Sequence, residues 1–563
     1  MNLGIDFGST YSMLSYFDND EKILKAVAPE GDSPHIPSVV CRKSKTSDTY
    51  VYGTLAKKTS DKKPELDSYR AFKMLLPVTD KKKLEQNGYR NGITPRKISR
   101  DFLQSQIQTA RKRLNVNCFD QITICIPYIW DKDYSTLSGK GILYEICQDL
   151  QKEGMMRSFR VISEPAAATA CVAHKYHTKK GSLFNGWILI VDYGGGTLDI
   201  TLSKVSTIRR NGKDYMEISV EDQAGAGYHH ADNRIGDAGI AYMNAVIAQA
   251  LADEGLESPG SDSDLQIDFR NAVDLLEDTL KHDNEDLLDK AAESGNNPAV
   301  LEADRDDFMT FSYGDAEDVP VTYSTLARVY NRLIRPLLDQ ELKKIFNGKM
   351  RSALHMSAPT DHPADLQIAL VGGFGQFILV QQQVCEFFNI GDSDDIDIGK
   401  EDAISHGAAL IANGNIALQV RAPASIGICF PDETFDFAFL RGKQLEPDDR
   451  HFLNHIVFYM GSHLKADFPW KFVLNLDGNP NCGRVLIPID EEVRNKMLQI
   501  PAPGAFKCGF SVNESEIITF WYVEADTYGN YDPAKLQKKE LGNIPSIFGS
   551  VIDMEAAKLV VKK

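Results

Sequence analysis

Two short stretches place an acidic residue between an apolar run and a glycine turn. NLGIDFGSTYS (residues 2–12) contains Asp6, and WILIVDYGGGTLDI (residues 187–200) contains Asp192. Glycines at the end of a strand let backbone N–H groups approach an anion, and nearby hydroxyls add donors. Two such turns that face each other would hold a polyphosphate, with the carboxylates holding Mg²⁺ through water. The residues of the two turns are Gly8, Ser9, Thr10, Tyr11, Gly194, Gly195, Gly196 and Thr197.

A third glycine pair follows an apolar run in IALVGGFGQ (368–376). Gly372 and Gly373 would let the backbone approach a sugar or a base; the alternative is a plain strand-to-helix turn. The sequence contains no G-x-x-x-x-G-K-[ST] motif, which excludes the P-loop. The three turns together predict a nucleoside triphosphate site in a cleft between two lobes.

The elements that must position these turns alternate between strand-like and helix-like patterns. We expect strands at 121–126, 187–192, 199–205 and 366–371, and helices at 101–114, 238–251 and 324–346. This alternation is typical of an α/β protein with a parallel sheet. The length of 563 residues suggests several compact units.

The pattern changes after Gly414 to short apolar or alternating runs separated by turns. These runs predict antiparallel strands at 455–460, 471–476, 484–489 and 517–523. A domain boundary is therefore expected near 414–421.

Charge and cysteine usage exclude several classes of partner. The net charge of −17 and the pI near 5.2 argue against a nucleic-acid binder. The chain has no apolar run long enough to cross a membrane, and its first residues are strand-like, unlike a signal peptide. The nine cysteines form no C-x-x-C pair, which fits a reducing cytoplasm. The pairs His174/His177 and His451/His455 lack the further ligands of a zinc site.

The motifs resemble those of the 70-kDa heat-shock chaperones, in the actin, sugar-kinase and heat-shock ATPase superfamily. GIDFGSTYS (4–12) and VDYGGGTLD (191–199) are similar to the two phosphate motifs of that family. VISEPAAATA (161–170) and EDAISHGAAL (401–410) resemble its connecting segments, and LVGGFGQF (370–377) its adenosine motif. The resemblance implies an α/β fold with a duplicated actin-like (ribonuclease H-like), two-lobed ATPase domain.

The C-terminal part carries a second resemblance, to the substrate-binding β-sandwich of the same chaperones. LQIPAPGAFKCGFSVNESEIITF (498–520) and APASIGICF (422–430) are similar to the end and the opening of that domain. The expected organisation is an ATPase domain at 1–414, a linker at 415–421, an antiparallel β-sandwich at 422–526 and a short tail without a full helical lid at 527–563.

The resemblance also assigns roles to individual residues. Asp6 and Asp192 would organise Mg²⁺ through water, and Lys73, in AFKMLL (71–76), would position the attacking water. Glu164 and Asp199 would complete a polar cage. Phosphate contacts are expected from Ser9, Thr10 and Thr197, and close backbone approach from Gly194, Gly195, Gly196, Gly372 and Gly373. Pro127, in ICIPYIWD (124–131), stands where the family has a proline implicated in signalling between domains; the alternative is a strand terminator.

Three features depart from the family pattern. Glu277 and Asp278 stand where a cation that stacks on adenine is expected, and Gln376 replaces a second one after Phe374. If the alignment with the family is shifted along this segment, Lys281 would be the first cation that stacks on adenine. IALQVRA (416–422) lacks the acidic residue of the usual linker, and we expect no full helical lid in the tail at 527–563.

The leading functional hypothesis is an ATP-dependent chaperone that binds and hydrolyses ATP between two lobes and couples nucleotide state to the binding of extended, unfolded polypeptide segments. The resemblance implies ATP/ADP and Mg²⁺ as cofactors, and a J-domain co-chaperone and a nucleotide exchange factor as partners. The alternatives are a nucleotide-binding co-chaperone, exchange factor or scaffold with little turnover, and a small-molecule kinase or actin-like filament protein.

Overall fold

The computed structural model divides the chain into two compact units, which are Met1–Gly139 with Ile146–Ala417, and Lys140–Glu145 with Leu418–Lys563. No helix in the described residues is long and apolar enough to span a membrane. The structure describes residues 1–28, 33–45, 48–128, 130, 137–194, 197–210, 212–227, 238–260, 265–282, 287, 290, 298–361, 363–390, 397–398, 402–422, 424–430, 434–446, 449–454, 457–459, 471–475, 484–489, 491–497, 504–513, 517–526 and 528–543.

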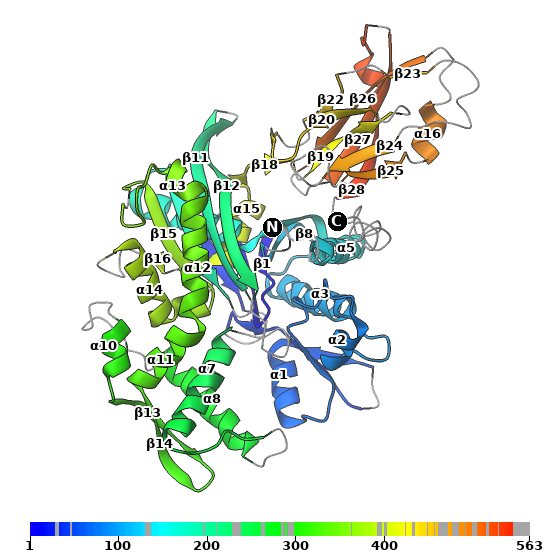
Figure 1. The fold of residues 1–563 in the computed structure, drawn as a ribbon. Coiled ribbons are helices and arrows are strands. Elements are labelled where there is room, and N and C mark those ends of the chain that lie inside the picture. Colours follow the sequence, from blue (N-terminus) through cyan, green and yellow to red (C-terminus); the bar gives the residue numbers. More distant parts are fainter. Residues whose placement is uncertain are drawn as a thin grey trace. The chain divides into compact units, whose positions relative to one another are not determined.

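The first unit is a mixed α/β structure with two six-stranded sheets (Figure 1). The first sheet has the order β3-β2-β1-β8-β9, and β4 also pairs with β2. β1 is antiparallel to β2 and parallel to β8, and β8 is parallel to β9. The strands are β1 (Asn2–Asp6), β2 (Tyr11–Asp18), β3 (Ile23–Val27), β4 (Ile36–Pro37), β8 (Phe119–Ile126) and β9 (Met156–Ser163).

The second sheet has the order β16-β15-β10-β11-β12-β17. β10 is antiparallel to β11 and parallel to β15, so its pairing repeats that of β1 with β2 and β8. The strands expected at 187–192, 199–205 and 366–371 are confirmed. The bounds are β10 (Gly186–Tyr193), β11 (Thr197–Arg210), β12 (Lys213–Gly227), β15 (Leu366–Val371), β16 (Asp397–Ile398) and β17 (Ile416–Leu418).

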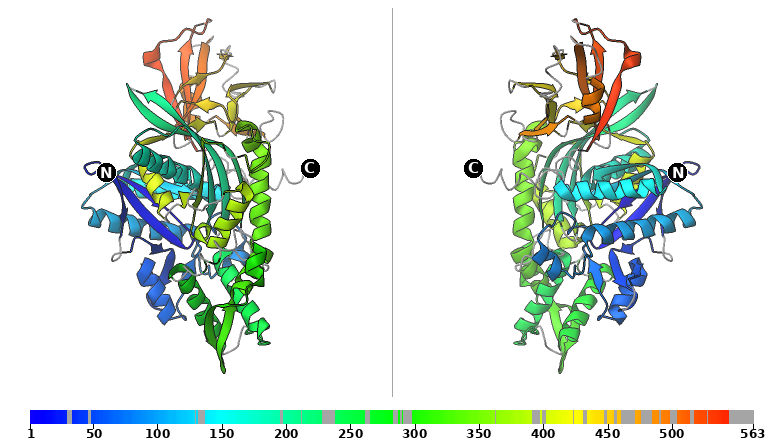
Figure 2. Two further views of the ribbon diagram at one scale, coloured as in Figure 1. Left: turned by 90° about the vertical axis from the view of Figure 1, so that its left-hand side faces the viewer. Right: turned by 90° about the vertical axis from the view of Figure 1, so that its right-hand side faces the viewer.

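Two helices, one after the last parallel strand of each sheet, pack closely on each other (Figure 2). α6 (Glu164–Lys180) follows β9, and α15 (Ala403–Ala412) follows β16. A Cβ atom at Gly407 of α15 would lie 1.7 Å from the carbonyl oxygen of Ala167 in α6. The absence of a side chain at Gly407 therefore allows the two backbones to touch.

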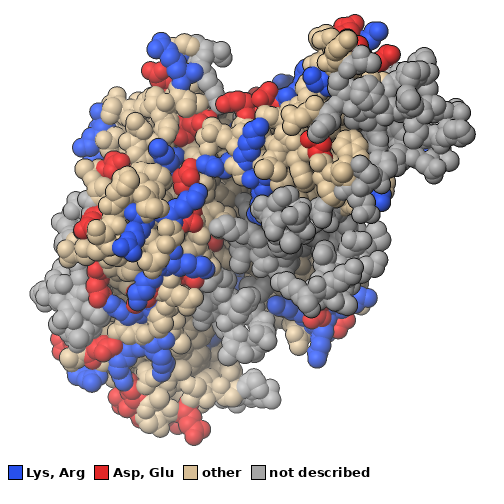
Figure 3. All heavy atoms as spheres, turned by 45° about the horizontal axis from the view of Figure 1, so that its top comes forward, with Lys and Arg blue, Asp and Glu red and all other residues tan. Residues whose placement is uncertain are grey.

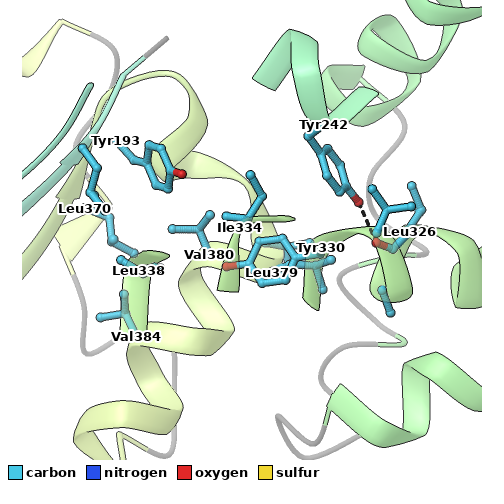
Figure 4. Close-up of a cluster of buried hydrophobic side chains, with 14 of the residues drawn as sticks. Tyr193, Tyr242, Leu326, Tyr330, Ile334, Leu338, Leu370, Leu379, Val380 and Val384 are labelled. Carbon is cyan, nitrogen blue, oxygen red and sulfur yellow. Dashed lines mark hydrogen bonds between the residues drawn. The ribbon is translucent and has the colours of Figure 1, made fainter. Parts of the chain in front are cut away.

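Helices on the second sheet enclose a large apolar core that contains the buried Tyr242 and Tyr330 (Figure 4). The Tyr242 hydroxyl donates to the Leu326 carbonyl (2.9 Å), and the Tyr330 hydroxyl donates to Gln383 Oε1 (2.6 Å). The helices expected at 101–114 and 238–251 are confirmed. The helix expected at 324–346 is divided at Ile334, because Pro336 in the first turn of the second helix has no N–H to continue the first one.

The other elements of this unit complete its two halves. The remaining strands are β5 (Val39–Arg42), β6 (Tyr50–Tyr52), β7 (Ser68–Arg70), β13 (Asp307–Tyr313) and β14 (Ala316–Thr322). The helices are α1 (Gly53–Lys62), α2 (Lys81–Gln86), α3 (Pro95–Arg113), α7 (Ala238–Asp253), α8 (Gln266–His282), α10 (Pro298–Ala303), α11 (Tyr323–Leu333), α12 (Arg335–Ile345), α13 (Arg351–Ala353) and α14 (Ile378–Phe388). A further helix, α5 (Leu137–Lys152), is divided between the units, because its residues Lys140–Glu145 are grouped with the second unit.

The second unit contains two antiparallel sheets, with the orders β20-β19-β24-β25 and β22-β26-β27-β28; β23 also pairs with β26. Phe472 of β24 contacts Phe510 of β26 and Phe520 of β27, which joins the apolar faces of the two sheets. The bounds are β19 (Ser425–Cys429), β20 (Phe435–Phe439), β22 (His451–Phe452), β23 (Val457–Tyr459), β24 (Lys471–Asn475), β25 (Arg484–Pro488), α16 (Glu491–Met497), β26 (Gly504–Val512), β27 (Ile517–Ala525) and β28 (Gln537–Asn543).

Two segments differ from the organisation expected from the sequence. β28 pairs with β27, so the sheet extends beyond residue 526, where we expected it to end. Its polar sequence, QKKELGN, carries no apolar alternation because β28 is an edge strand. The segment 415–421, expected as a linker, contains β17, which pairs with β12, and β18 (Val420–Arg421), which pairs with β21 (Gln444–Leu445).

Candidate functional site

The first glycine turn joins β1 to β2 directly after Asp6. A Cβ atom at Gly8 would lie 1.9 Å from the Tyr11 carbonyl oxygen, so only glycine allows this turn to close. Ser38 Oγ donates to the Gly8 carbonyl (2.7 Å), and the Ser38 backbone N–H donates to the Thr10 carbonyl (2.8 Å). Gly8, Ser9 and Tyr11 are half-buried, and Thr10 is exposed. The two hydrogen bonds from Ser38 therefore hold the turn in place, and Thr10 remains exposed.

The second glycine turn joins β10 to β11 and brings two carboxylates together. Asp192 and Asp199 are directly paired across the antiparallel strands. The Gly194 N–H donates to the Thr197 carbonyl (3.0 Å), and the Thr197 side chain hydrogen-bonds Asp199. Gly195 and Gly196 lie outside the described residues.

Lys73 and Glu164 form an ion pair inside this site. Lys73 is 1% exposed and follows β7, and Glu164 is the first residue of α6. The Lys73 ammonium lies 5.8 Å from the centre of the Phe7 ring, next to Asp6 in the chain. Two residues that are 91 positions apart thus meet at the end of β1.

Burial and like charge raise the pKa values of the three aspartates. Burial raises the pKa of Asp6 to about 7; Glu164 adds to the rise and Lys73 opposes it. Burial raises the pKa of Asp192 well above its usual range, with added repulsion from Glu164, Asp199 and Asp6. Burial, and then the charge of Glu164, raise the pKa of Asp199 to about 7. The hydrogen bond from Thr197 and the charge of Lys73 oppose this rise. These mutual effects place Asp6, Lys73, Glu164, Asp192 and Asp199 in one cluster, the carboxylate cluster.

The glycine pair after β15 lies against this cluster. Gly372 has a φ of +82°, and a Cβ atom there would lie 2.6 Å from both Asp192 Oδ1 and the Tyr193 carbonyl oxygen. Gly373 is exposed, and a Cβ atom there would meet no atom within 4 Å. Phe374 packs edge-to-face on Tyr193, with ring centres 5.0 Å apart. The amide nitrogen of Gln376 is buried and has no hydrogen-bond partner among the described residues.

The other predicted residues lie elsewhere in the first unit. Glu277 is half-buried on α8, and Lys281 belongs to the last turns of the same helix, which packs on α7 and β13. Pro127 directly follows β8, and the Trp130 N–H donates to its carbonyl (3.1 Å).

Sequence reasoning missed two residues at the site. Ser38 lies 30 residues from Gly8, and no local signal connects them. Cys125 is fully buried near the end of β8; burial, and then the charges of Asp6 and Glu164, raise the pKa of its thiol well above the usual range. Cys125 occupies an ordinary strand position in the sequence, so only the tertiary structure reveals its place.

The site fits a hydrated Mg²⁺ ion. Within the described residues, no group of three or more His, Cys, Asp or Glu side chains could hold a metal directly. Four acidic groups nevertheless crowd around a single lysine, and Asp199 Oδ2 is buried without a hydrogen-bond partner in that part of the chain. A divalent cation bound through water would relieve this repulsion.

The chain is similar to three curated chaperones. It is 26% identical to "Chaperone protein DnaK" of Mycoplasmoides gallisepticum over 261 residues, which cover 46% of this chain and 37% of the relative. It is 27% identical to "Chaperone protein DnaK 3" of Synechococcus sp. over 321 residues, which cover 57% of this chain and 41% of the relative. It is 24% identical to "Chaperone protein DnaK" of Ureaplasma urealyticum serovar 10 over 415 residues, which cover 72% of this chain and 57% of the relative. These low-identity similarities support a divergent relationship to the 70-kDa heat-shock protein family.

The divergence of this heat-shock relative is visible in two further results. No protein-family model matches the chain. The matched regions cover 37–57% of the length of the three relatives, so the chain spans less than two thirds of each of them.

Proposed function

We propose that this heat-shock relative is an ATP-dependent chaperone that binds and hydrolyses ATP at the carboxylate cluster and uses its second unit to bind extended polypeptide segments. The observation that carries this proposal is the cluster itself: four acidic residues and Lys73, delivered by β1, β10, β11, α6 and the segment after β7, meet between two glycine turns. The repeated strand order of the two sheets supports a duplicated actin-like domain.

The residues of the cluster suit phosphoryl transfer to water. Asp6 and Asp192 would hold the Mg²⁺–phosphate complex through water, and Asp199 would accept hydrogen bonds from its waters. Mg²⁺ supplies neutralisation of phosphate charge when bound. Lys73, fixed by Glu164, would orient the attacking water and stabilise charge on the γ-phosphate. Ser9, Thr10, Tyr11, Thr197 and the glycines of the two turns would contact the phosphates.

The second unit is proposed to be the polypeptide-binding domain. Its two antiparallel sheets with a shared apolar interior support a β-sandwich beginning near residue 422. Extended segments would bind through backbone hydrogen bonds and apolar pockets. A J-domain co-chaperone and a nucleotide exchange factor are proposed as partners, and the cytoplasm as the compartment.

The charge of the chain agrees with protein partners in place of nucleic acid. On the face seen in Figure 3, Lys and Arg side chains are interspersed with Asp and Glu and form no continuous basic field. The net charge is −17. Nucleic-acid binding requires clustered cations that replace the counterions of the phosphates.

A second candidate function is a nucleotide-binding scaffold, co-chaperone or exchange factor with little turnover. Glu277 and Gln376 favour it, because they stand where the family has cations that stack on adenine. Loss of a stacking contact would lower base affinity by about 1 kcal/mol, several-fold in Kd.

Single-turnover hydrolysis of ATP separates the two candidates. We expect hydrolysis by the wild-type protein that accelerates with an unfolded apolar peptide, and hydrolysis reduced by at least about 100-fold in Lys73→Ala. Lys81→Ala, in the exposed first turn of α2, is the matched control. Binding of a fluorescent ATP analogue reports whether Lys73→Ala is folded. Equal turnover in Lys73→Ala and wild type would refute the enzyme assignment, and nucleotide binding without turnover in wild type would favour the scaffold.

A further inference from the structure

One face of the second unit carries a row of aromatic and cationic residues across four strands. Phe452 of β22 is paired with Gly509 of β26, Gly509 with Trp521 of β27, and Trp521 with Lys538 of β28. Adjacent strands lie about 4.8 Å apart, so the row is about 14 Å long. Side chains alternate along each strand, and Phe520, next to Trp521, faces the other sheet. The row therefore points away from that sheet.

Cations lie over the aromatic rings of this row. The Arg450 guanidinium is 4.4 Å from the centre of the Trp521 ring, and the Lys538 ammonium is 5.8 Å from it. The Trp521 Nε1–H donates to Ser511 Oγ (2.8 Å), which fixes the ring in place. Arg450 and Lys538 are exposed, and Trp521 is half-buried. The ring thus holds two charged groups at the surface.

Lys507 extends the same face beyond Phe452. Its ammonium lies 5.5 Å from the centre of the Phe452 ring and 5.6 Å from that of Tyr531. A Cβ atom at Gly509 would lie 3.0 Å from Phe452 Cδ1, so the glycine makes room for the Phe452 ring. We name the six residues the cationic aromatic face: Arg450, Phe452, Lys507, Trp521, Tyr531 and Lys538.

None of the three cations has a carboxylate partner among the described residues. The neighbour of Lys538 on β28, Lys539, does form such an ion pair, with Glu492 (3.1 Å). An aromatic ring attracts a cation through its quadrupole but leaves the net charge intact. Three positive charges are therefore held in position without neutralisation, although the whole chain carries −17.

We propose that the cationic aromatic face binds a short, extended, acidic segment of a partner polypeptide. An extended chain rises about 3.3 Å per residue, so about five residues span the row, and their three alternate carboxylates would reach the three cations. A long polyanion would meet repulsion from the acidic remainder of the chain, which favours a short acidic segment over nucleic acid. This site differs in chemistry from the proposed apolar peptide site, and all of its residues belong to the second unit.

The test uses the full-length chain and a fluorescein-labelled peptide of about ten residues with alternating Glu and Ser, followed by anisotropy. We expect Lys507→Gln/Lys538→Gln to weaken binding at least about fivefold and to reduce its salt dependence. Lys507→Arg/Lys538→Arg, which keeps both charges, should bind within about twofold of wild type. Lys62→Gln/Lys471→Gln, two exposed lysines on α1 and β24 outside the sheet that carries the row, is the charge-matched control and should also stay within about twofold.

Four outcomes would overturn the proposal. The first is equal weakening by the control pair, and the second is equal binding of a Gln/Ser peptide. The third is competition by an unlabelled apolar unfolded peptide, which would place the probe in the proposed peptide site. The fourth is tighter binding of oligo-dT of matched charge, which would assign the face to nucleic acid. The loss of ATP turnover in Lys73→Ala is a separate measurement and should leave the probe affinity unchanged.

Discussion

At the scale of single residues, the carboxylate cluster holds more negative charge than its protein surroundings neutralise. Lys73 faces Glu164, while Asp6, Asp192 and Asp199 keep raised pKa values because they are buried and close to one another. A buried charge is stable only when it is paired or hydrogen-bonded, or when it takes up a proton. The raised pKa values therefore favour proton uptake by these aspartates, and a bound cation would favour their charged forms instead.

The raised pKa values predict that the nucleotide-free protein loses stability as pH rises from about 4 to 7. Asp6 and Asp199 titrate near 3.8 when unfolded and at about 7 when folded. The folded state then binds more protons in this window, so the free energy of unfolding falls with increasing pH, by up to roughly 4 kcal/mol for each of the two groups. Denaturant titrations at several pH values measure this slope.

Asp199→Asn should flatten this pH dependence and raise the stability of the nucleotide-free protein, because one crowded carboxylate is removed. The same variant should weaken Mg²⁺-dependent nucleotide binding. Asp48→Asn, whose side chain is 97% exposed, is the control and should change neither quantity. A steeper slope in Asp199→Asn would contradict the proposed repulsion.

Gly372 and Gly373 form a matched pair for a second residue-scale prediction. Gly372→Ala forces a Cβ atom to 2.6 Å from Asp192 Oδ1 at a φ of +82°, so we expect a loss of about 1–3 kcal/mol in stability and weaker nucleotide binding. A Cβ atom at Gly373 meets no protein atom within 4 Å, so Gly373→Ala should leave the melting temperature close to that of wild type. Thermal melting and nucleotide titration of both variants check this, and equal effects would contradict it.

At the scale of elements, the pair α6 and α15 links the ends of the two sheets of the first unit. Each helix follows the last parallel strand of its own sheet, and the two helices touch at Gly407 and Ala167. Gly4 of β1 lies against α15, and a Cβ atom at Gly4 would be 2.4 Å from the Ser405 carbonyl oxygen of that helix. Small residues at these points bring the two halves of the site together.

Gly407→Ala should destabilise the protein, although helix propensity alone would stabilise α15 by about 1 kcal/mol. The new Cβ atom would lie 1.7 Å from the Ala167 carbonyl oxygen, so the helices must move apart. We expect a net loss of about 1–3 kcal/mol in urea unfolding. A gain in stability would show that the two helices are not in tight contact.

At the scale of the whole molecule, the two glycine turns belong to different sheets, and one nucleotide would bind both. Mg²⁺–ATP should therefore slow amide hydrogen exchange at residues 6–11 and 192–199 together and raise the melting temperature. The expected stabilisation is about 2.7 kcal/mol at a concentration of 100 Kd. AMP, which lacks the β- and γ-phosphates, is the control and should protect neither turn to the same degree. Protection of one turn alone would contradict a shared site.

The sequence by itself determined the elements around the site and their order. The apolar runs at 121–126, 187–192 and 366–371 predict strands because a buried parallel strand needs continuous apolar side chains. The glycine turns after Asp6 and Asp192 were predicted from local chemistry, since glycine permits close backbone approach.

Only the tertiary structure decided which residues share the site. Lys73 meets Glu164 across 91 residues, Ser38 supports the Gly8 turn, and Cys125 reaches the cluster from an ordinary strand position. The edge strand β28 and the row from Phe452 to Lys538 likewise depend on strand register. Register and helix contact are long-range properties that arise from packing, and a local sequence pattern carries no record of them.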